Sequence, residues 1–501
     1  MAKLDIASGR LGVIRGAYIL PVALLAVLSG CTLGPDYQRP ALDVPAQHRH
    51  AELATTGAVV DVAWWKQWGD PVLAALVDEA LTANQDIAAS SARVEQFYGS
   101  LGQIRGQLYP QIGADLGGTR SRASGRSVSP APAQNPYSGY QADLTVSWEI
   151  DLFGRVRRLT EAAQADLQAA EEARRGVLLS VVAATASGYV TLRDLDNRLE
   201  VSRRTLASRE AALKLFERRF RGGVISEVEL SQARTEYARA LQSVPQYEQL
   251  VSQQENALSL LLGRNPGPIA RGLSIDQFQP PPVPAGLPSE LLERRPDVRQ
   301  AEQSLVAANA RIGAAKALYF PRISLTGAFG SESSGLSNLW SGPARTWSYG
   351  GMLVAPIFTG GSTQSQVFGA EGAQREALAL YRQSVQTAFR EVDDALVGIR
   401  NTVQSRDAQK LQVDSTGRYA QLARRKYEGG YTSYLEVLDA ERSQFSAELA
   451  YSQGIGDVLL QQIAMLKALG GSWVEWAEKN ASPPRSLDVA ESTATSPRQE
   501  K

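Results

Sequence analysis

Two acidic residues in the second half of the chain, Glu436 and Asp439, have a spacing that could act electrostatically. Residues three apart project from one face of a helix, so both carboxylates would point in the same direction. If symmetry repeated them around a narrow pore, they would form rings that favour cations and repel anions. The alternative is ordinary surface charge, because carboxylates are common near a helix N-terminus, where they offset the helix dipole.

Residues for covalent catalysis are not recognisable. The sequence contains no nucleophile-and-base pair, glycine-rich phosphate loop or histidine–carboxylate cluster. The two histidines, His48 and His50, lie in a Pro-rich N-terminal arm and are expected to be exposed rather than bound to a metal. Lys+Arg 52 balances Asp+Glu 52, which gives no reason to expect a nucleic-acid partner. The sequence therefore predicts no enzyme, no metal and no cofactor.

The single cysteine, Cys31, marks the end of a predicted signal peptide over residues 1–30. Basic residues precede an apolar run from Ile19 to Leu28 that is too short to span a membrane. The run closes with Leu28-Ser29-Gly30-Cys31, which resembles a bacterial lipobox and implies cleavage before Cys31 and lipidation of its thiol, palmitate included. Thr32, in place of an aspartate, resembles lipoproteins sent to the outer membrane. An ordinary signal peptide with an incidental cysteine is the alternative.

An internal duplication of roughly 200 residues organises the rest of the chain. Tyr109-Pro110-Gln111-Ile112 returns as Tyr319-Phe320-Pro321-Arg322-Ile323, and Phe220-Arg221-Gly222-Gly223 returns as Tyr427-Glu428-Gly429-Gly430. Each copy combines short segments that alternate by twos with one very long helical segment. The elements that must position the acidic residues therefore occur twice.

Alternating apolar and polar residues predict a strand hairpin in each copy, at about 111–151 and about 322–358. Tyr140 to Asp151 alternates without a break, which suits a membrane strand of ~9–11 residues, although a strand of a soluble sandwich would alternate too. The last strand carries Trp347, Tyr349, Leu353 and Ile357 on one face. No stretch after Cys31 approaches ~18 apolar residues, so no transmembrane helix is expected. Four strands cannot close a barrel, whereas three copies would supply twelve.

Long helical hairpins follow the strands. No proline occurs between Arg155 and Val244 or between Ile357 and Ser482, and apolar residues recur at intervals of seven, which indicates packing of the coiled-coil type. The glycine pairs Gly222-Gly223 and Gly429-Gly430 are expected to end the first helices, because glycine adopts the left-handed conformation of a C-terminal cap. Return helices would start at Ser226 and at Thr432-Ser433, as N-caps. Pro245 is expected to kink the first return helix.

Three motifs resemble one protein family over the chain from Cys31 to about Trp476. They are Cys31-Thr32-Leu33-Gly34-Pro35-Asp36-Tyr37-Gln38-Arg39-Pro40, Trp64-Trp65-Lys66-Gln67-Trp68 and Leu292-Glu293-Arg294-Arg295-Pro296-Asp297-Val298. Together they resemble the outer-membrane-factor lipoproteins of tripartite efflux systems, in the nodulation-T branch of the TolC-like family. The resemblance implies a mixed α/β membrane protein. It would be a homotrimer whose twelve-stranded β-barrel in the outer membrane, in contact with its lipid, continues into a periplasmic α-helical barrel.

The family pattern also implies a division of the chain into six parts. These are the signal peptide 1–30; a lipidated N-terminal arm and equatorial segment 31–69; the first repeat 70–265, with its helical hairpin at about 155–263; a Pro-rich equatorial linker 266–288; the second repeat 289–470, with its helical hairpin at about 361–469; and a C-terminal equatorial segment and disordered tail 471–501. The helix tips would face the inner membrane.

By the same resemblance, Glu436 and Asp439 fall at the family's acidic selectivity ring, and Glu229 and Tyr427 fall at positions that hold the tips closed. Tyr427 also lies on the seven-residue repeat, so packing is an equal alternative. Thr432 departs from the pattern, because some relatives have an arginine there. The latch would then use another group, with Arg218, Arg219 and Arg221 on the facing tip as candidates.

The function implied is a passive exit duct, gated at the helix tips, that works with a periplasmic adaptor and an inner-membrane pump of the RND type. The outer-membrane component of a type I protein secretion system is the first alternative. A periplasmic adaptor lipoprotein is a weaker one, because an adaptor resembles a single helical hairpin and would not explain two strand hairpins with acidic faces.

Overall fold

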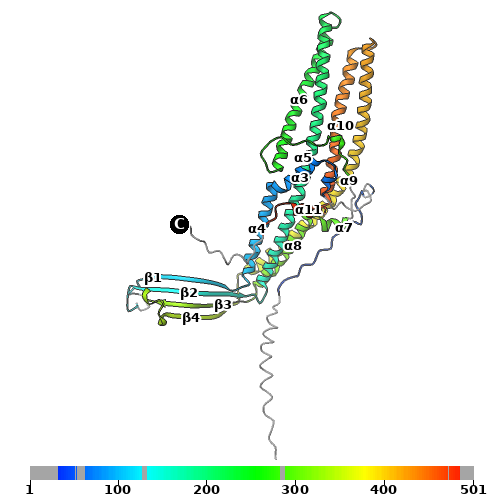
Figure 1. The fold of residues 1–501 in the computed structure, drawn as a ribbon. Coiled ribbons are helices and arrows are strands. Elements are labelled where there is room, and N and C mark those ends of the chain that lie inside the picture. The colour runs from blue at the N-terminus through cyan, green and yellow to red at the C-terminus, as the bar shows by residue number, and fades with distance from the viewer. Residues whose placement is uncertain are drawn as a thin grey trace, which may run out of the picture. The chain divides into compact units, whose positions relative to one another are not determined.

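A computed structural model describes residues 32–50, 52, 63–126, 132–281, 288–471 and 473–485. Cys31, the predicted signal peptide and most of the predicted C-terminal tail lie outside the described residues. The chain, drawn in Figure 1, divides by its internal contacts into two compact units. The first unit takes residues 1–40, 96–168 and 303–379, and the second takes residues 41–95, 169–302 and 380–501.

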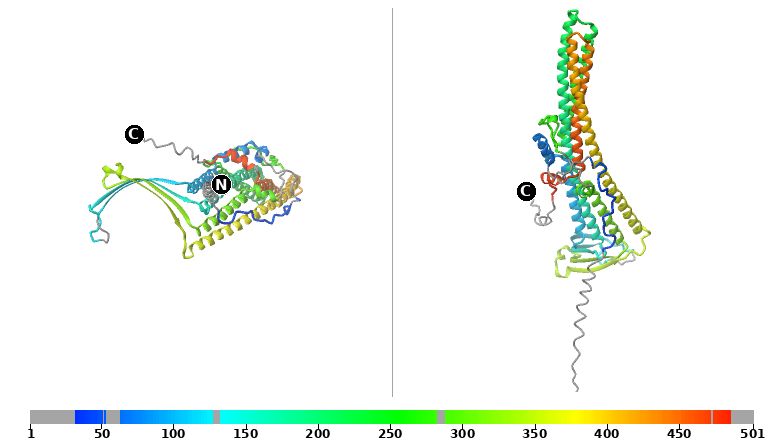
Figure 2. Two further views of the ribbon diagram at one scale, coloured as in Figure 1. Left: turned by 90° about the horizontal axis from the view of Figure 1, so that it is seen from below. Right: turned by 90° about the vertical axis from the view of Figure 1, so that its right-hand side faces the viewer.

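The first unit is built on one antiparallel sheet of four strands in the order β1-β2-β3-β4. The strands are β1 (Gln111–Ser121), β2 (Tyr137–Ile150), β3 (Arg322–Ser333) and β4 (Arg345–Val354). The sheet is curved, as the view from below shows (Figure 2). The two edge strands, β1 and β4, are exposed along their whole length. The predicted extension of the last strand to Ile357 is wrong: β4 ends at Val354, shortly before Pro356, which has no N–H to donate to a ladder.

The register of the sheet separates a polar face from an apolar one. Asp115 lies opposite Asp143, and the side-chain oxygens of Asp115 and Asp143 accept hydrogen bonds from Thr145 and Gln141 on that same face. On the other face, Leu116 lies opposite Ala142. The alternation that predicted these strands therefore corresponds to two chemically different surfaces of one sheet.

Helices of the two copies have pairwise equal lengths. They contain 22 residues in α4 (Gln85–Gly106) and α8 (Pro296–Ala317), 67 in α5 (Arg155–Arg221) and α9 (Ser362–Glu428), and 35 in α6 (Glu227–Leu261) and α10 (Tyr434–Ala468). The shorter helices are α2 (Trp64–Gln67), α3 (Pro71–Ala83), α7 (Pro288–Arg294) and α11 (Trp473–Asn480), with 3-10 turns at Ile275–Gln277, Leu336–Asn338 and Gly342–Ala344. Pro245 lies inside α6, which continues on both sides of it.

Matching turns join the long helices of each copy. After α5, the Gly223 N–H donates to the Phe220 carbonyl and the Val224 N–H to the Arg219 carbonyl, both at 2.9 Å. The bonds after α9 follow the same pattern, and φ is +69° at Gly223 and +76° at Gly430. These are Schellman caps, and only glycine adopts that φ without strain.

A tryptophan cluster forms much of the core of the second unit. Trp64, Trp65 and Trp68, from the motif around α2, are buried, and the ring of Trp65 packs edge-on against Trp473 of α11 at 5.5 Å between centroids. Helix α5 contributes Leu178 and Leu192 to the same core. One 18-residue window of α5 is apolar enough to cross a membrane by composition, and 56% of that window is buried inside the chain.

Arg295, between α7 and α8, ties together elements far apart in sequence. It is 5% exposed and donates from Nη1 to the Ala468 carbonyl at the end of α10, at 2.9 Å. It also pairs with Asp297 and with Glu391 of α9, each at 2.7 Å. The Arg295 charge is balanced by two carboxylates and by the negative end of the α10 dipole, which explains why an arginine can be buried here.

Candidate functional site

The tips of the two helical hairpins, in the second unit, lie side by side (Figure 1). An aromatic cluster joins them: the ring of Phe216 on α5 lies 4.1 Å from Tyr434 on α10 and 6.4 Å from Tyr427 on α9, between centroids. Phe216 is only 2% exposed. The tips of a single chain are therefore packed against one another and not merely adjacent.

Tyr427 also makes a polar contact across the tips. Its hydroxyl accepts a hydrogen bond of 3.2 Å from Nη1 of Arg219 on α5. Of the three arginines considered as latch candidates, Arg221 instead bonds the Glu217 carbonyl of its own helix, and Arg218 is exposed. Tyr427 thus both packs in the aromatic cluster and makes a hydrogen bond to the facing hairpin.

Glu229 serves its own helix. Its carboxylate accepts from the Ser226 backbone N–H at 2.9 Å and from the Ser226 hydroxyl at 3.1 Å, while its own N–H donates to that hydroxyl. This reciprocal pattern is a capping box at the start of α6. Within one chain, the structure does not bring Glu229 to the facing tip.

Glu436 has the same spacing from a serine, Ser433, but a different environment. The Ser433 side chain makes no capping bond, contrary to the prediction that it would. Instead the Thr432 hydroxyl donates to the Glu436 carboxylate, and Nζ of Lys426 on α9 lies 4.0 Å from it. Thr432, the departure from the family pattern, therefore binds the predicted ring residue itself.

Asp439 lies on the same side of α10 as Glu436, as the three-residue spacing predicts. Both carboxylates act on the phenol of Tyr419 on α9. Desolvation, together with the charges of Asp439 and Glu436, raises the pKa of Tyr419, whose hydroxyl is hydrogen-bonded to Asp439. Asp439 itself is exposed. The acidic pair thus lies on an accessible flank of α10, close to the tip.

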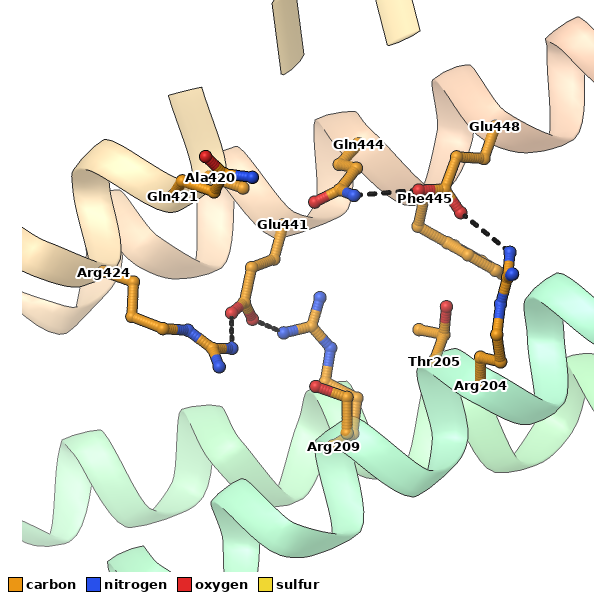
Figure 3. Close-up of a pocket in the computed structure, with 11 residues that line it drawn as sticks. Arg204, Thr205, Arg209, Ala420, Gln421, Arg424, Glu441, Gln444, Phe445 and Glu448 are labelled. Carbon is orange, nitrogen blue, oxygen red and sulfur yellow. Dashed lines mark hydrogen bonds and ion pairs between the residues drawn. The ribbon is translucent and has the colours of Figure 1, made fainter. Parts of the chain in front are cut away.

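An ion-pair cluster behind the tips was not predicted from the sequence. The carboxylate of Glu441 on α10 bonds both Arg209 of α5 and Arg424 of α9, at the edge of a cavity of about 450 Å³ (Figure 3). The side chains of Arg209 and Glu441 are 6% and 10% exposed. Burial lowers the pKa of Arg209. A signal did exist, because Arg209 stands seven residues after Ser202 and seven before Phe216, on a buried seam of α5.

A second ion pair links the hairpins on the α6 side. Glu236 of α6, which is buried, lies 3.4 Å from Nε of Arg442 on α10 and 3.0 Å from Nη1 of Arg239. Each hairpin therefore presents buried charge to the other, at Arg209–Glu441 and at Glu236–Arg442. Breaking such a pair leaves an uncompensated buried charge.

The prediction that both histidines are exposed is wrong for His48, which is buried, and His50 is only partly exposed. His48 is 5% exposed, its Nε2 has no hydrogen-bond partner among the described residues, and burial lowers its pKa although the charge of Asp393 acts in the opposite direction. His50 lies 3.5 Å from Glu52. In the described part of the chain, no three potential ligands gather into a metal site.

The sequence model of the family described as outer membrane efflux protein matches residues 76–264 and 287–471. The chain is 37% identical over 468 residues to the probable efflux pump outer membrane protein TtgC of Pseudomonas putida, covering 91% of this chain and 96% of TtgC. The solved outer-membrane channel OprN has a TM-score of 0.82 at 30% identity, over 89% of this chain and 100% of that chain. The open state of the Neisseria gonorrhoeae MtrE outer membrane channel has a TM-score of 0.80 at 31% identity, over 88% and 99%.

Proposed function

The chain belongs to the outer membrane efflux protein family, and from that premise we propose that it is the exit duct of a tripartite efflux system, gated at its periplasmic helix tips. Membership confirms the predicted family, the fold class of outer-membrane channels and the outer-membrane location. It also confirms a role in efflux as a channel and not as an enzyme. The names of the relatives favour efflux over protein secretion.

The observation that best supports this proposal is the four-stranded sheet with two unpaired edges. A sheet of this kind leaves the ladder groups of β1 and β4 unpaired, which a bilayer does not tolerate. Pairing β4 of one copy with β1 of the next would remove both edges. The polar face with Asp115 and Asp143 would then line the lumen, and the face with Leu116 and Tyr349 would meet lipid.

The gate, in this proposal, is at the tips of α9 and α10. Glu436 and Asp439 would form the acidic ring, and the Arg219–Tyr427 hydrogen bond would hold the tips of each chain together. Opening would separate the hairpins. A periplasmic adaptor would grip the tips and an inner-membrane pump of the RND type would load the duct, while lipidation of Cys31 would add an anchor at the membrane.

The test is electrical. The purified full-length protein is reconstituted into a planar bilayer, and single-channel currents are recorded before and after the tips are loosened by Arg219→Ala. We expect small, cation-selective currents that grow in the variant. A protein that inserts and remains folded, yet conducts in neither form, would rule out the duct.

A further inference from the structure

A hollow of about 590 Å³ lies on the sheet of the first unit, outside the parts that the duct explains. We call it the outer-face groove. Its side-chain lining is Ala114, Leu116, Ala142, Leu144, Phe329, Ser331, Trp340 and Arg345. Backbone of Asp115 and Asp143 also borders it, but those side chains bond Thr145 and Gln141 on the opposite face. The groove therefore belongs to the apolar face of the sheet.

The register explains why this face is hollow here. One rung across the four strands reads Leu116, Ala142, Ser331, Arg345, and the next reads Ala114, Leu144, Phe329, Trp347. Small residues at Ala114, Ala142 and Ser331 form the floor, while the larger Leu116, Leu144 and Phe329 stand beside them. The hollow is thus set by the side chains of rigid strands, as a preformed binding site requires.

A loop between β3 and β4 closes one end of the groove. Trp340 projects from this loop and is 76% exposed, whereas its neighbour Leu339 and the later Ala344 are buried. The loop is therefore packed, with its indole left at the surface. An exposed indole beside an apolar face is typical of residues that lie at the level of lipid headgroups.

Arg345 supplies the only cationic side chain of the lining. It is exposed and forms no ion pair or side-chain hydrogen bond with any residue that the structure describes. A guanidinium that faces lipid without a carboxylate partner is available to bind an anionic ligand. Its planar arrangement of N–H donors matches the oxygens of a phosphate group. Arg345 begins β4, at the end of the sheet away from the start of α9, so in this topology it lies toward the outer leaflet.

We propose that the outer-face groove binds a phosphorylated glycolipid of the outer leaflet, of the lipid A class. Acyl chains would lie over Ala114, Leu116 and Leu144, whose apolar side chains are exposed. A headgroup phosphate would bind Arg345, beside the indole of Trp340. Apolar walls and one unpaired cation at the end nearest the headgroups match an amphiphile with an anionic head and not a free phosphate.

Native mass spectrometry of the intact, delipidated protein tests the proposal with three probes: lipid A, phosphatidylglycerol and phosphatidylethanolamine. We expect the wild type to retain lipid A in preference to both phospholipids. Arg345→Ala should lower that retention about tenfold, and Arg345→Lys should restore part of it. Ala114→Phe, which places a ring in the groove at an exposed position, should lower retention while Arg345 is kept.

Arg322→Ala is the matched control, because Arg322 is an exposed strand arginine at the other end of β3, on the polar-face register. It should leave lipid A retention unchanged. An equal loss of lipid A retention in Arg322→Ala and Arg345→Ala would indicate general charge attraction and would overturn specific binding in the groove. Equal retention of the three lipids by the wild type, or unchanged retention in Arg345→Ala, would overturn it as well. Bilayer conductance of each variant reports correct assembly separately, so failure of the duct and failure of the lipid site are distinguishable.

Discussion

At the scale of single residues, the two copies use the same glutamate differently. Glu229 and Glu436 both stand three residues after a serine, but only Glu229 closes a capping box with it. In the second copy the Thr432 hydroxyl instead donates a hydrogen bond to the Glu436 carboxylate. The duplication therefore kept the spacing while the hydrogen-bond partner of the glutamate changed, and Glu436 does not close a capping box at the start of its own helix.

The Arg219–Tyr427 hydrogen bond should resist separation of the tips. A bond between a charged and a neutral group at a half-buried site stabilises by about 1 kcal/mol, so Arg219→Ala should raise the open fraction about fivefold. Tyr427→Phe keeps the stack on Phe216 and should have a similar effect. Single-channel recording of both variants and of the double variant measures it.

The double variant distinguishes one shared hydrogen bond from two independent effects of the side chains. If the two side chains act through one bond, the combined change adds little to either single change. Arg218→Ala is the control, because Arg218 is an exposed neighbour in the same last turn. Additive effects of the two single changes would contradict a shared bond.

Glu436 and Asp439 should set ion selectivity. Replacing both by Gln and Asn removes their charge with little change of shape, so the preference for cations and the block by divalent cations should weaken together. Reversal potentials under a salt gradient measure the change. Glu227→Gln, an exposed carboxylate of the first tip, should leave both properties intact. Wild-type selectivity in the double variant would show that Glu436 and Asp439 do not form the selectivity ring.

At the scale of elements, helices and caps could be predicted while their lateral contacts could not. The seven-residue repeat and the glycine pairs predict the long helices, because those signals are local. The Arg209–Glu441 pair joins residues 232 apart in number, and no local pattern specifies such a partner. The seven-residue spacing of Arg209 from Ser202 and Phe216 could have predicted its burial, but not the carboxylate with which it pairs.

Glu441 should matter more to hairpin packing than any surface carboxylate. Glu441→Gln leaves the buried Arg209 without a full counter-charge, which costs about 3–5 kcal/mol by analogy with other broken buried pairs. We expect faster hydrogen exchange in α5 and α10 near the tips. Glu210→Gln, which breaks the exposed Glu210–Lys214 pair, is the matched control and should change exchange little.

Because Arg209 is buried, Glu441→Gln should speed hydrogen exchange more than Glu210→Gln does. If Glu441→Gln and Glu210→Gln changed exchange equally, the cluster in Figure 3 would contribute no more than a surface pair. The Arg424 side chain is half exposed and can be hydrated when Glu441 is lost, whereas the Arg209 side chain is only 6% exposed and loses more. The destabilised helix should therefore be α5 rather than α9.

At the scale of the whole molecule, the equal helix lengths of the two copies make one chain quasi-symmetric. A copy contributes two strands and one long hairpin, and the two family-model matches cover both copies. The number of copies of the chain then fixes the size of the closed sheet. Two chains would give eight strands, three would give twelve and four would give sixteen.

The polar face of the sheet argues for three chains over two. A barrel of about 8 strands is filled by its own side chains, and burying Asp115 and Asp143 there without cations would be very costly. Twelve strands leave a hydrated lumen in which these carboxylates stay solvated. We therefore expect native mass spectrometry of the conducting species to give three mature chains. Cys31→Ala should leave that mass free of lipid and still trimeric, because paired strand edges, and not the anchor, hold the assembly together. A conducting dimer, or a trimer that dissociates when Cys31 is replaced, would contradict this account.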